Sequence, residues 1–382
     1  MPDSTAMDYE LMYAPDAYYG SYNKPVILTA TENIAESKTL TRGWTWMSLY
    51  VEPFSPGIND VLAMTSNDRK KVQTIKSKTA IATPTKDYSS FTGTLQEIYP
   101  GNMYKIQVAS TLNLNLYGTV IDVEKHTQTI YPGFNWIGSL SNTVLSLEDA
   151  FSDLQPKKDD MVKTRTAMSV YNGEGIWEGT LKSLVPGVGY IYLSQDDQVK
   201  TFHYPKYDFG GNAYAQSISF FEDGDSEENG LYYQPVDDHQ FPDNMNVIAV
   251  VQLDGENLDN AEVGAFANDE CRGAVNCING YYFLTIMGSS VDDMQTPFEI
   301  RVHHEGQDYV VTELPFISDA VYGSLENPYV IDLNATGIRN VNYDADDTEW
   351  YTLEGFKIGR RPTKSGVYIH RGQKVTVRSM RK

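Results

Sequence analysis

An acidic run is the pattern in this sequence with the clearest potential chemistry. Asp223, Asp225 and Glu227 alternate like the first oxygen ligands of a calcium loop, because a hard cation needs several carboxylates brought together by a tight turn. Gly224 and Gly230 could supply that turn. The glycine that an EF-hand needs at its sixth loop position is missing. We therefore interpret the run as a solvated acidic loop and keep calcium binding as the alternative.

Tyrosines beside glycine or proline form the second candidate group. Tyr204, Tyr207 and Tyr214 have no counterpart in the internal repeat described below, so we expect them to be exposed. Exposed aromatic rings stack on sugar rings or contact a partner protein. Ordinary loop packing is the alternative for these three side chains.

Sequence motifs of the common enzyme classes are absent from the 382 residues. There is no nucleophile elbow, Walker loop, dinucleotide-binding glycine turn or HExxH helix. Among six histidines, only His303 and His304 are adjacent, and neighbours on a strand face opposite sides. A carboxylate pair for glycoside hydrolysis cannot be located from sequence, and we expect no catalytic residue and no cofactor.

The net charge of −21 argues against nucleic acid as a partner, since an acidic surface repels a phosphate backbone. Residues 351–382 differ, with nine Lys/Arg and one acid. This basic tail either contacts an anionic partner or docks on the acidic domains of its own chain, and we favour docking. No apolar run approaches the roughly 20 residues of a membrane-spanning helix. Cys271 and Cys277 lack the spacing of a metal site, and we interpret both as reduced packing residues.

An internal repeat sets the expected architecture. Four pairs of segments match, at offsets of 90, 87, 86 and 86 residues: Gly43–Trp46 with Gly133–Trp136, Ile75–Ala80 with Val162–Ala167, Phe91–Leu95 with Trp177–Leu181, and Pro100–Tyr104 with Pro186–Tyr190. Each copy predicts a small α+β unit dominated by short strands. Because an aromatic residue that recurs in both copies is most simply a core residue, we expect Trp44, Trp46, Trp136 and Trp177 to fill the core of each unit.

One short helix is predicted in each repeat. Leu147, Ala150, Phe151 and Leu154 fall at helical spacing, Ser146 precedes them as the N-cap, and Pro156 lies just beyond the expected end. The same spacing begins at Ile58 in the first repeat.

Residues 245–333 alternate with period two, which is typical of strands and indicates a β-sandwich. Asn279-Gly280 lies between two apolar segments, and both residues accept the positive φ of a two-residue turn. We therefore predict a β-hairpin at this position. Near the C-terminus, three short strands are expected at residues 350–353, 366–370 and 374–377.

The predicted fold class is mainly β and multi-domain, with two small strand-rich α+β repeats, an immunoglobulin-like β-sandwich and a short C-terminal β element. The expected boundaries are 1–39 (N-terminal segment or end of a preceding repeat), 40–125 (repeat 1), 126–203 (repeat 2), 204–243 (linker with exposed loops and the acidic run), 244–334 (β-sandwich) and 335–382 (C-terminal β tail).

A family resemblance rests on these motifs. The Gly-Trp-x-Trp opening and the later Pro-Gly-x-x-Tyr, present at Gly43 and Pro100 and again at Gly133 and Pro186, resemble repeats in exported surface proteins of Bacteroidetes-type bacteria. Residues 245–333 are similar to a β-sandwich module that often follows such repeats. The C-terminal strands resemble type IX sorting tails, although this tail is shorter than typical ones.

The resemblance implies a secreted or cell-surface location and a non-catalytic role in adhesion, glycan capture or display. Partners would be a glycan or a surface protein. The N-terminus lacks the features of a signal peptide, so we expect the export signal to be removed or to lie upstream. The alternative is an accessory region of an exported glycan-degrading or proteolytic enzyme whose catalytic domain is not in this chain.

Overall fold

The computed structural model describes residues 33–206, 230–293 and 296–334, and short C-terminal strands between residues 350 and 377. Strands dominate these residues and form several separate sheets, so the prediction of a mainly β, multi-domain protein is confirmed. The helices in the described ranges are single turns: α1 (Ile58–Val61), α2 (Ser66–Arg69), α3 (Leu147–Ala150) and the 3₁₀ turn η1 (Asp238–Gln240).

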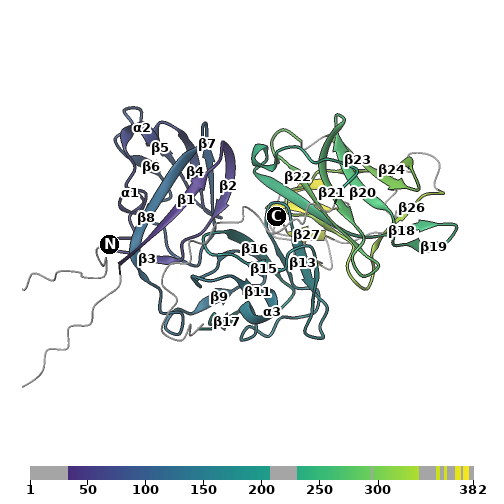
Figure 1. Ribbon diagram of the computed structural model, residues 1–382, viewed down its shortest axis with the longest axis horizontal. Coiled ribbons are helices and arrows are strands. Elements are labelled where there is room, and N and C mark those ends of the chain that lie inside the picture. Colours follow the sequence, from purple (N-terminus) through teal and green to yellow (C-terminus); the bar gives the residue numbers. More distant parts are fainter. Residues whose placement is uncertain are drawn as a thin grey trace, which may run out of the picture. The chain divides into compact units, whose positions relative to one another are not determined.

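Repeat 1 consists of two sheets around one core. The larger sheet has the order β2 (Gly43–Met47), β7 (Tyr104–Val108), β4 (Val72–Lys76), β5 (Ile81–Pro84), β6 (Phe91–Gly93). The smaller has the order β1 (Asn33–Leu40), β8 (Leu112–Val120), β3 (Val51–Pro53). Leu114 on β8 and Ile106 on β7 belong to the same buried cluster, so the core lies between the two sheets (Figure 1).

Repeat 2 has its own five-stranded sheet, which matches the larger sheet of repeat 1. Its order is β10 (Gly133–Gly138), β16 (Gly189–Ser194), β12 (Met161–Lys163), β13 (Met168–Tyr171), β14 (Trp177–Gly179). Two strand pairs complete it: β9 (Gln128–Ile130) with β17 (Lys200–Phe202), and β11 (Leu145–Ser146) with β15 (Ser183–Leu184). In both repeats the strand before the sheet pairs with the strand after it, β1 with β8 and β9 with β17.

The two larger sheets agree residue by residue. Trp46 pairs with Lys105 in repeat 1, and Trp136 pairs with Ile191 in repeat 2. These four positions are related by the offsets of 90 and 86 seen in the sequence. The internal repeat is therefore a duplicated module with one strand order and one register.

The recurring Pro-Gly-x-x-Tyr motif has a structural explanation in a tyrosine hydroxyl. Tyr99 donates its backbone N–H to the Tyr104 hydroxyl at 2.8 Å, and Val185 donates to the Tyr190 hydroxyl at 2.6 Å. Both tyrosines are buried, and each satisfies the backbone N–H that precedes the proline. A similar tyrosine-to-backbone bond fixes corners in other β-sandwiches.

A glycine recurs at Gly93 and Gly179 because only glycine fits there. Both have φ of +145°, which other residues rarely adopt. A Cβ at Gly93 would lie 2.2 Å from the carbonyl oxygen of Ile81, and one at Gly179 would lie 2.3 Å from that of Met168.

Both predicted helices form, although each is one turn long. Ser146 accepts the backbone N–H of Asp149 at 3.1 Å, so it is the N-cap of α3 as predicted. Leu147 and Ala150 are buried in α3, and Ile58 and Val61 are buried in α1.

Residues 243–332 form a β-sandwich of two sheets (green in Figure 1). In one sheet, β18 (Asp243–Leu253) pairs antiparallel with β22 (Tyr282–Gly288) and β19 (Glu256–Leu258), and parallel with β25 (Val321–Tyr322) and β26 (Tyr329–Asp332). The other sheet has the order β21 (Glu270–Asn276), β20 (Glu262–Ala267), β23 (Pro297–His304), β24 (Gln307–Pro315). Val247 and Ile300 belong to the single core between them.

The predicted turn at Asn279-Gly280 forms, but the hairpin prediction is wrong. Both residues have positive φ, and Ile278 and Tyr281 exchange two backbone hydrogen bonds. The flanking strands β21 and β22 then enter different sheets. The turn therefore links the two layers of the sandwich, because each flanking strand pairs with another partner.

The C-terminal strands form one sheet with the order β28 (Lys357–Ile358), β27 (Trp350–Thr352), β29 (Gly366–His370), β30 (Gln373–Val377). The three predicted strands are present, and β28 is an addition.

Candidate functional site

Of the predicted site residues, Tyr204 lies within the described part of the chain. Tyr204 is 1% exposed, so the expectation that it is exposed is wrong. Its hydroxyl donates to the carbonyl oxygen of Gly138 at 3.1 Å, and its ring packs edge-on against Phe202. The pairing of β17 with β9 folds this part of the chain back onto the core of repeat 2. The other predicted residues, Tyr207, Tyr214, Asp223, Asp225 and Glu227, lie outside the described residues.

The recurring tryptophans do not share one role. Trp177 lies in the core of repeat 2, as predicted, and its counterpart Phe91 lies in the core of repeat 1. Trp46 and Trp136 instead belong to a separate cluster with Met103 and other residues from both repeats. The prediction that these two fill the core of each unit is therefore wrong. Both lie on the sheet face away from the core of their own module, where residues of the two repeats pack against each other.

Backbone contacts between the repeats are reciprocal. Gly138 donates its N–H to the Gly101 carbonyl at 3.0 Å, and Ser48 donates to the Gly187 carbonyl at 3.0 Å. Ser48 and Gly138 are equivalent positions in the two repeats, as are Gly101 and Gly187. The two modules are thus related by a local two-fold axis, as in an isologous dimer contained in one chain.

Two cations extend this reciprocity. Lys78 donates to the carbonyl oxygen of Phe134 at 2.6 Å, and Arg165 donates to the carbonyl oxygen of Trp44. Lys78 and Arg165 are equivalent, and so are Trp44 and Phe134. We call this contact between the repeats, together with residues 237–244 that cover it, the joint.

Lys105 is the buried charge at the centre of the joint. Its ammonium lies 4.4 Å from the ring centroid of Trp46 and 4.8 Å from that of Trp136. It donates to the Pro242 carbonyl at 2.8 Å and pairs with Asp243 at 2.9 Å. Burial opposes ionisation of Asp243, but the Lys105 charge outweighs it and lowers the pKa of that carboxyl.

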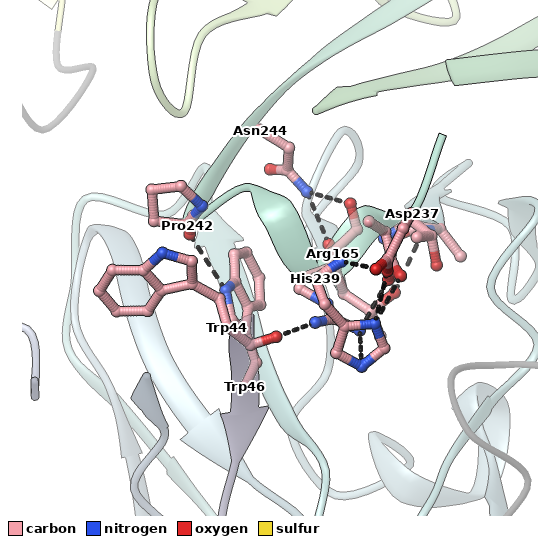
Figure 2. Close-up of polar contacts among 11 residues, drawn as sticks. Trp44, Trp46, Arg165, Asp237, His239, Pro242 and Asn244 are labelled. Atoms are coloured by element: carbon pink, nitrogen blue, oxygen red, sulfur yellow. Dashed lines mark hydrogen bonds and ion pairs between the residues drawn. The ribbon is translucent and has the colours of Figure 1, made fainter. Parts of the chain in front are cut away.

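Residues 237–239 form the second charged cluster of the joint. Figure 2 shows Arg165 between the Trp44 carbonyl and this turn. The Arg165 guanidinium lies 2.6 Å from Asp238, and the His239 ring lies 3.0 Å from both Asp237 and Asp238. The hydrogen bond with Asp238 raises the pKa of His239, against burial and the Arg165 charge. Burial opposes ionisation of Asp238, but His239 and Arg165 together lower its pKa.

The same three residues have atoms that could ligate a metal, since these atoms lie within 4.8 Å of one another. Arg165 already pairs with Asp238, however, and a divalent cation would have to displace the guanidinium. The arrangement is therefore suited to ion pairing across the joint.

The sequence predicted residues 204–243 as a linker with exposed loops. Residues 207–229 lie outside the described residues, and the described part packs at particular side chains. Among its described residues, Tyr233 and Phe241 are buried. Pro242 accepts a hydrogen bond from Trp46 at 3.2 Å (Figure 2). It accepts another from Lys105 at 2.8 Å. The segment packs because its carbonyl groups satisfy buried donors of repeat 1.

Repeat 2 also contacts the β-sandwich. Asn244 at the start of β18 donates to the carbonyl oxygens of Thr164 and Arg165, both at 2.8 Å. Lys163 is fully buried and pairs with Asp319 of the sandwich at 2.9 Å. Burial lowers the pKa of Lys163, and the Asp319 charge opposes that shift.

Sequence reasoning missed the charged residues of both contacts. They are Lys105, Lys163, Arg165, Asp238, His239 and Asp243. One available signal was the run of consecutive apolar residues in β16, because strands buried on both faces lose the alternation of half-exposed strands. Nothing local marks Asp238 or Asp243 as partners of residues more than 70 positions away.

No helix in the described ranges is long and apolar enough to cross a membrane. Cys271 and Cys277 are free thiols. Cys271 packs against Tyr233 and Phe266, and burial raises its pKa to about 11.

Comparisons with family models, with curated proteins and with solved structures give no match.

Proposed function

We propose that this chain is a non-catalytic binding or display protein, in which the duplicated module and the sandwich hold a glycan-binding or protein-binding surface in a fixed orientation. The observation that carries the proposal is the use of the buried charges. Lys105, Lys163 and Arg165 each pair with a carboxylate from another part of the chain. Side chains of catalytic type are thus committed to joining modules.

The ion pairs of the joint and of the contact with the β-sandwich support a scaffolding role, because breaking them costs folding free energy. A buried ion pair has a fixed geometry, and loss of one partner leaves an uncompensated charge that costs about 3–5 kcal/mol. Such pairs resist bending between modules, which suits a protein that presents a surface. The sequence resemblance to exported surface proteins supports a location outside the cell.

The test combines a turnover assay with a binding assay on the full chain. We expect no hydrolysis of a panel of neutral and acidic glycans or of peptides, and retention of the chain by at least one glycan or surface protein. External protease added to intact cells of the source organism should cleave the native protein. Turnover that co-elutes with the pure chain and is lost in Asp238→Asn or Asp243→Asn would contradict the proposal.

A further inference from the structure

A short strap crosses the outer face of the sheet formed by β21, β20, β23 and β24. We define the strap as residues 231–236. The backbone N–H groups of Tyr232 and Tyr233 donate to the two carboxylate oxygens of Glu262, at 2.6 and 2.7 Å. Val236 donates its N–H to the carbonyl oxygen of Cys271 at 2.9 Å. The strap is therefore fixed to the sheet at both ends.

Tyr233 is the buried anchor of the strap. Its ring packs edge-on against Phe266 at a centroid distance of 5.0 Å, and its hydroxyl donates to Asp308 at 3.0 Å. A Cβ on Gly264 would lie 2.8 Å from this ring. The Tyr233 ring can therefore pack directly on the backbone of β20, because Gly264 has no side chain.

Tyr232 is held as firmly but remains open to solvent. Its ring stacks on His303 at a centroid distance of 3.6 Å and an interplanar angle of 16°. Its hydroxyl donates to Asp308 at 3.2 Å, and His303 lies 2.8 Å from the same carboxylate. The side chain is nevertheless 54% exposed. His303 covers one face of the ring, and Tyr233 contacts it edge-on at a centroid distance of 5.1 Å, so the exposed surface belongs to the rest of the ring.

A fixed and exposed aromatic ring is suited to binding. An exposed tyrosine ordinarily keeps its rotamer freedom, and a ligand that stacks on it must first immobilise the ring. Here His303 and Asp308 have already immobilised it. Preorganisation of this kind is how rigid aromatic side chains give affinity at low entropic cost.

The surroundings define the class of ligand. Residues 244–334 contain 15 acidic and two basic residues, so this module repels phosphates, nucleic acids and acidic sugars. The Asp308 carboxylate lies at the edge of the ring and accepts from the Tyr232 hydroxyl. An apolar ring face beside hydrogen-bonding groups matches a neutral sugar, whose C–H face stacks while its hydroxyls bond to the rim.

We propose that Tyr232 is a stacking platform for a neutral pyranose ring of a glycan. This inference rests on the proposed function and names its ligand class. His303 is a positioning residue, because it contacts the covered face of the ring and not the sugar.

The test starts from an array of neutral glycans probed with the full chain, followed by titration of the best ligand. We expect Tyr232→Ala to weaken binding at least 10-fold. Tyr232→Phe should weaken it less, since the ring is kept and the tether to Asp308 is lost. Tyr131→Ala is the matched control, because Tyr131 is 59% exposed and lies on repeat 2 outside the strap. Unchanged melting temperatures will show that each variant is folded.

The positioning role of His303 is tested separately, by measuring glycan affinity in two variants. His303→Ala should weaken binding, and His303→Phe should restore it, because a phenyl ring can support Tyr232 from behind without the imidazole nitrogens. Failure of His303→Phe to rescue binding, with the fold intact, would contradict the positioning role.

Four outcomes would overturn the inference and leave the proposed function standing, and the first three concern glycan binding. They are an affinity unchanged in Tyr232→Ala, an equal loss in Tyr131→Ala, or an array on which no neutral glycan is bound while a surface protein is. A fourth is binding of a basic peptide such as residues 357–382 in place of a glycan, lost in Tyr232→Ala, which would make the ring a cation–π platform. Turnover, by contrast, would contradict the proposed function itself.

Discussion

Repeats 1 and 2 have the same strand order and register but different outer faces on their larger sheets. One row of cross-strand neighbours on this face consists of Gln107, Thr74 and Thr83 in repeat 1, and of Leu193, Met161 and Val170 in repeat 2. The first row is partly or fully exposed, with Thr83 exposed. The second row packs against Ile248 and Phe283 of the β-sandwich. The residues on the inner face are similar in both repeats because they form the core of the module. The residues on the outer face differ because only repeat 2 packs against the β-sandwich there.

A lysine position that occurs in both repeats shows the same difference in burial. Lys76 and Lys163 are equivalent, and each lies over an equivalent aromatic ring, Trp44 at 5.0 Å and Phe134 at 5.9 Å. Lys76 is half-buried, whereas Lys163 is fully buried and pairs with Asp319. A position inherited by duplication has therefore become a buried ion pair only where a second module covers it.

The largest expected effect separates the two reciprocal cations of the joint. Arg165→Ala removes a buried guanidinium that pairs with half-buried Asp238 and donates to the Trp44 carbonyl, and it should lower the free energy of unfolding by about 3 kcal/mol. Lys78→Ala removes an exposed side chain and should cost less than about 1 kcal/mol. Chemical denaturation of both variants measures the difference. Equal losses would mean that the turn at residues 237–239 does not stabilise the joint.

The local two-fold axis can be tested by exchanging residues across it. A Cβ on Gly138 would lie 1.6 Å from the Ser48 hydroxyl oxygen, so Gly138→Ser should destabilise the chain by about 1–3 kcal/mol. Ser48→Gly combined with Gly138→Ser exchanges the two equivalent residues and should recover most of that loss. Thermal unfolding of the single and double variants is the measurement. A double variant no better than Gly138→Ser would contradict the symmetric contact.

The contrast between the outer faces predicts unequal costs for opposite substitutions. Val170→Thr places a hydroxyl in the buried contact with the sandwich and should cost about 1–2 kcal/mol. Thr83→Val at the equivalent exposed position should change stability by at most about 0.5 kcal/mol. Denaturant midpoints of the two variants give the comparison. Similar values would show that repeat 2 and the sandwich separate readily in solution.

The smallest effect is a pH dependence of the joint. Because Asp238 raises the pKa of His239 above its ordinary value of 6.5, the folded state holds this proton more tightly than the unfolded state. The stabilisation is complete below pH 6.5 and is lost as pH rises through the folded pKa. Its loss should be less than about 1 kcal/mol. His239→Gln should flatten this part of the profile between pH 6 and pH 8.5, and an identical slope in the two proteins would contradict the assignment.

Some side-chain roles were predictable and others were not, for reasons that particular residues show. Ser146 was predicted as an N-cap because capping depends on residues three positions apart. Trp177 was placed correctly because a recurring aromatic at a matching strand position faces the core of its module. Trp46 follows the same rule in sequence but faces outward. Its partner Pro242 is 196 residues away, and nothing near Trp46 indicates that contact.

The sequence alone determined the strand-rich class, the duplication, the positions of the two predicted helices and the turn at Asn279-Gly280, because each depends on periodicity, spacing or backbone preference within a few residues. Tertiary structure decided which sheet faces are covered, why Tyr204 is buried and how Lys105 and Lys163 find their carboxylates. These features depend on packing between modules, where residues far apart in the chain meet and desolvation makes their pairing obligatory.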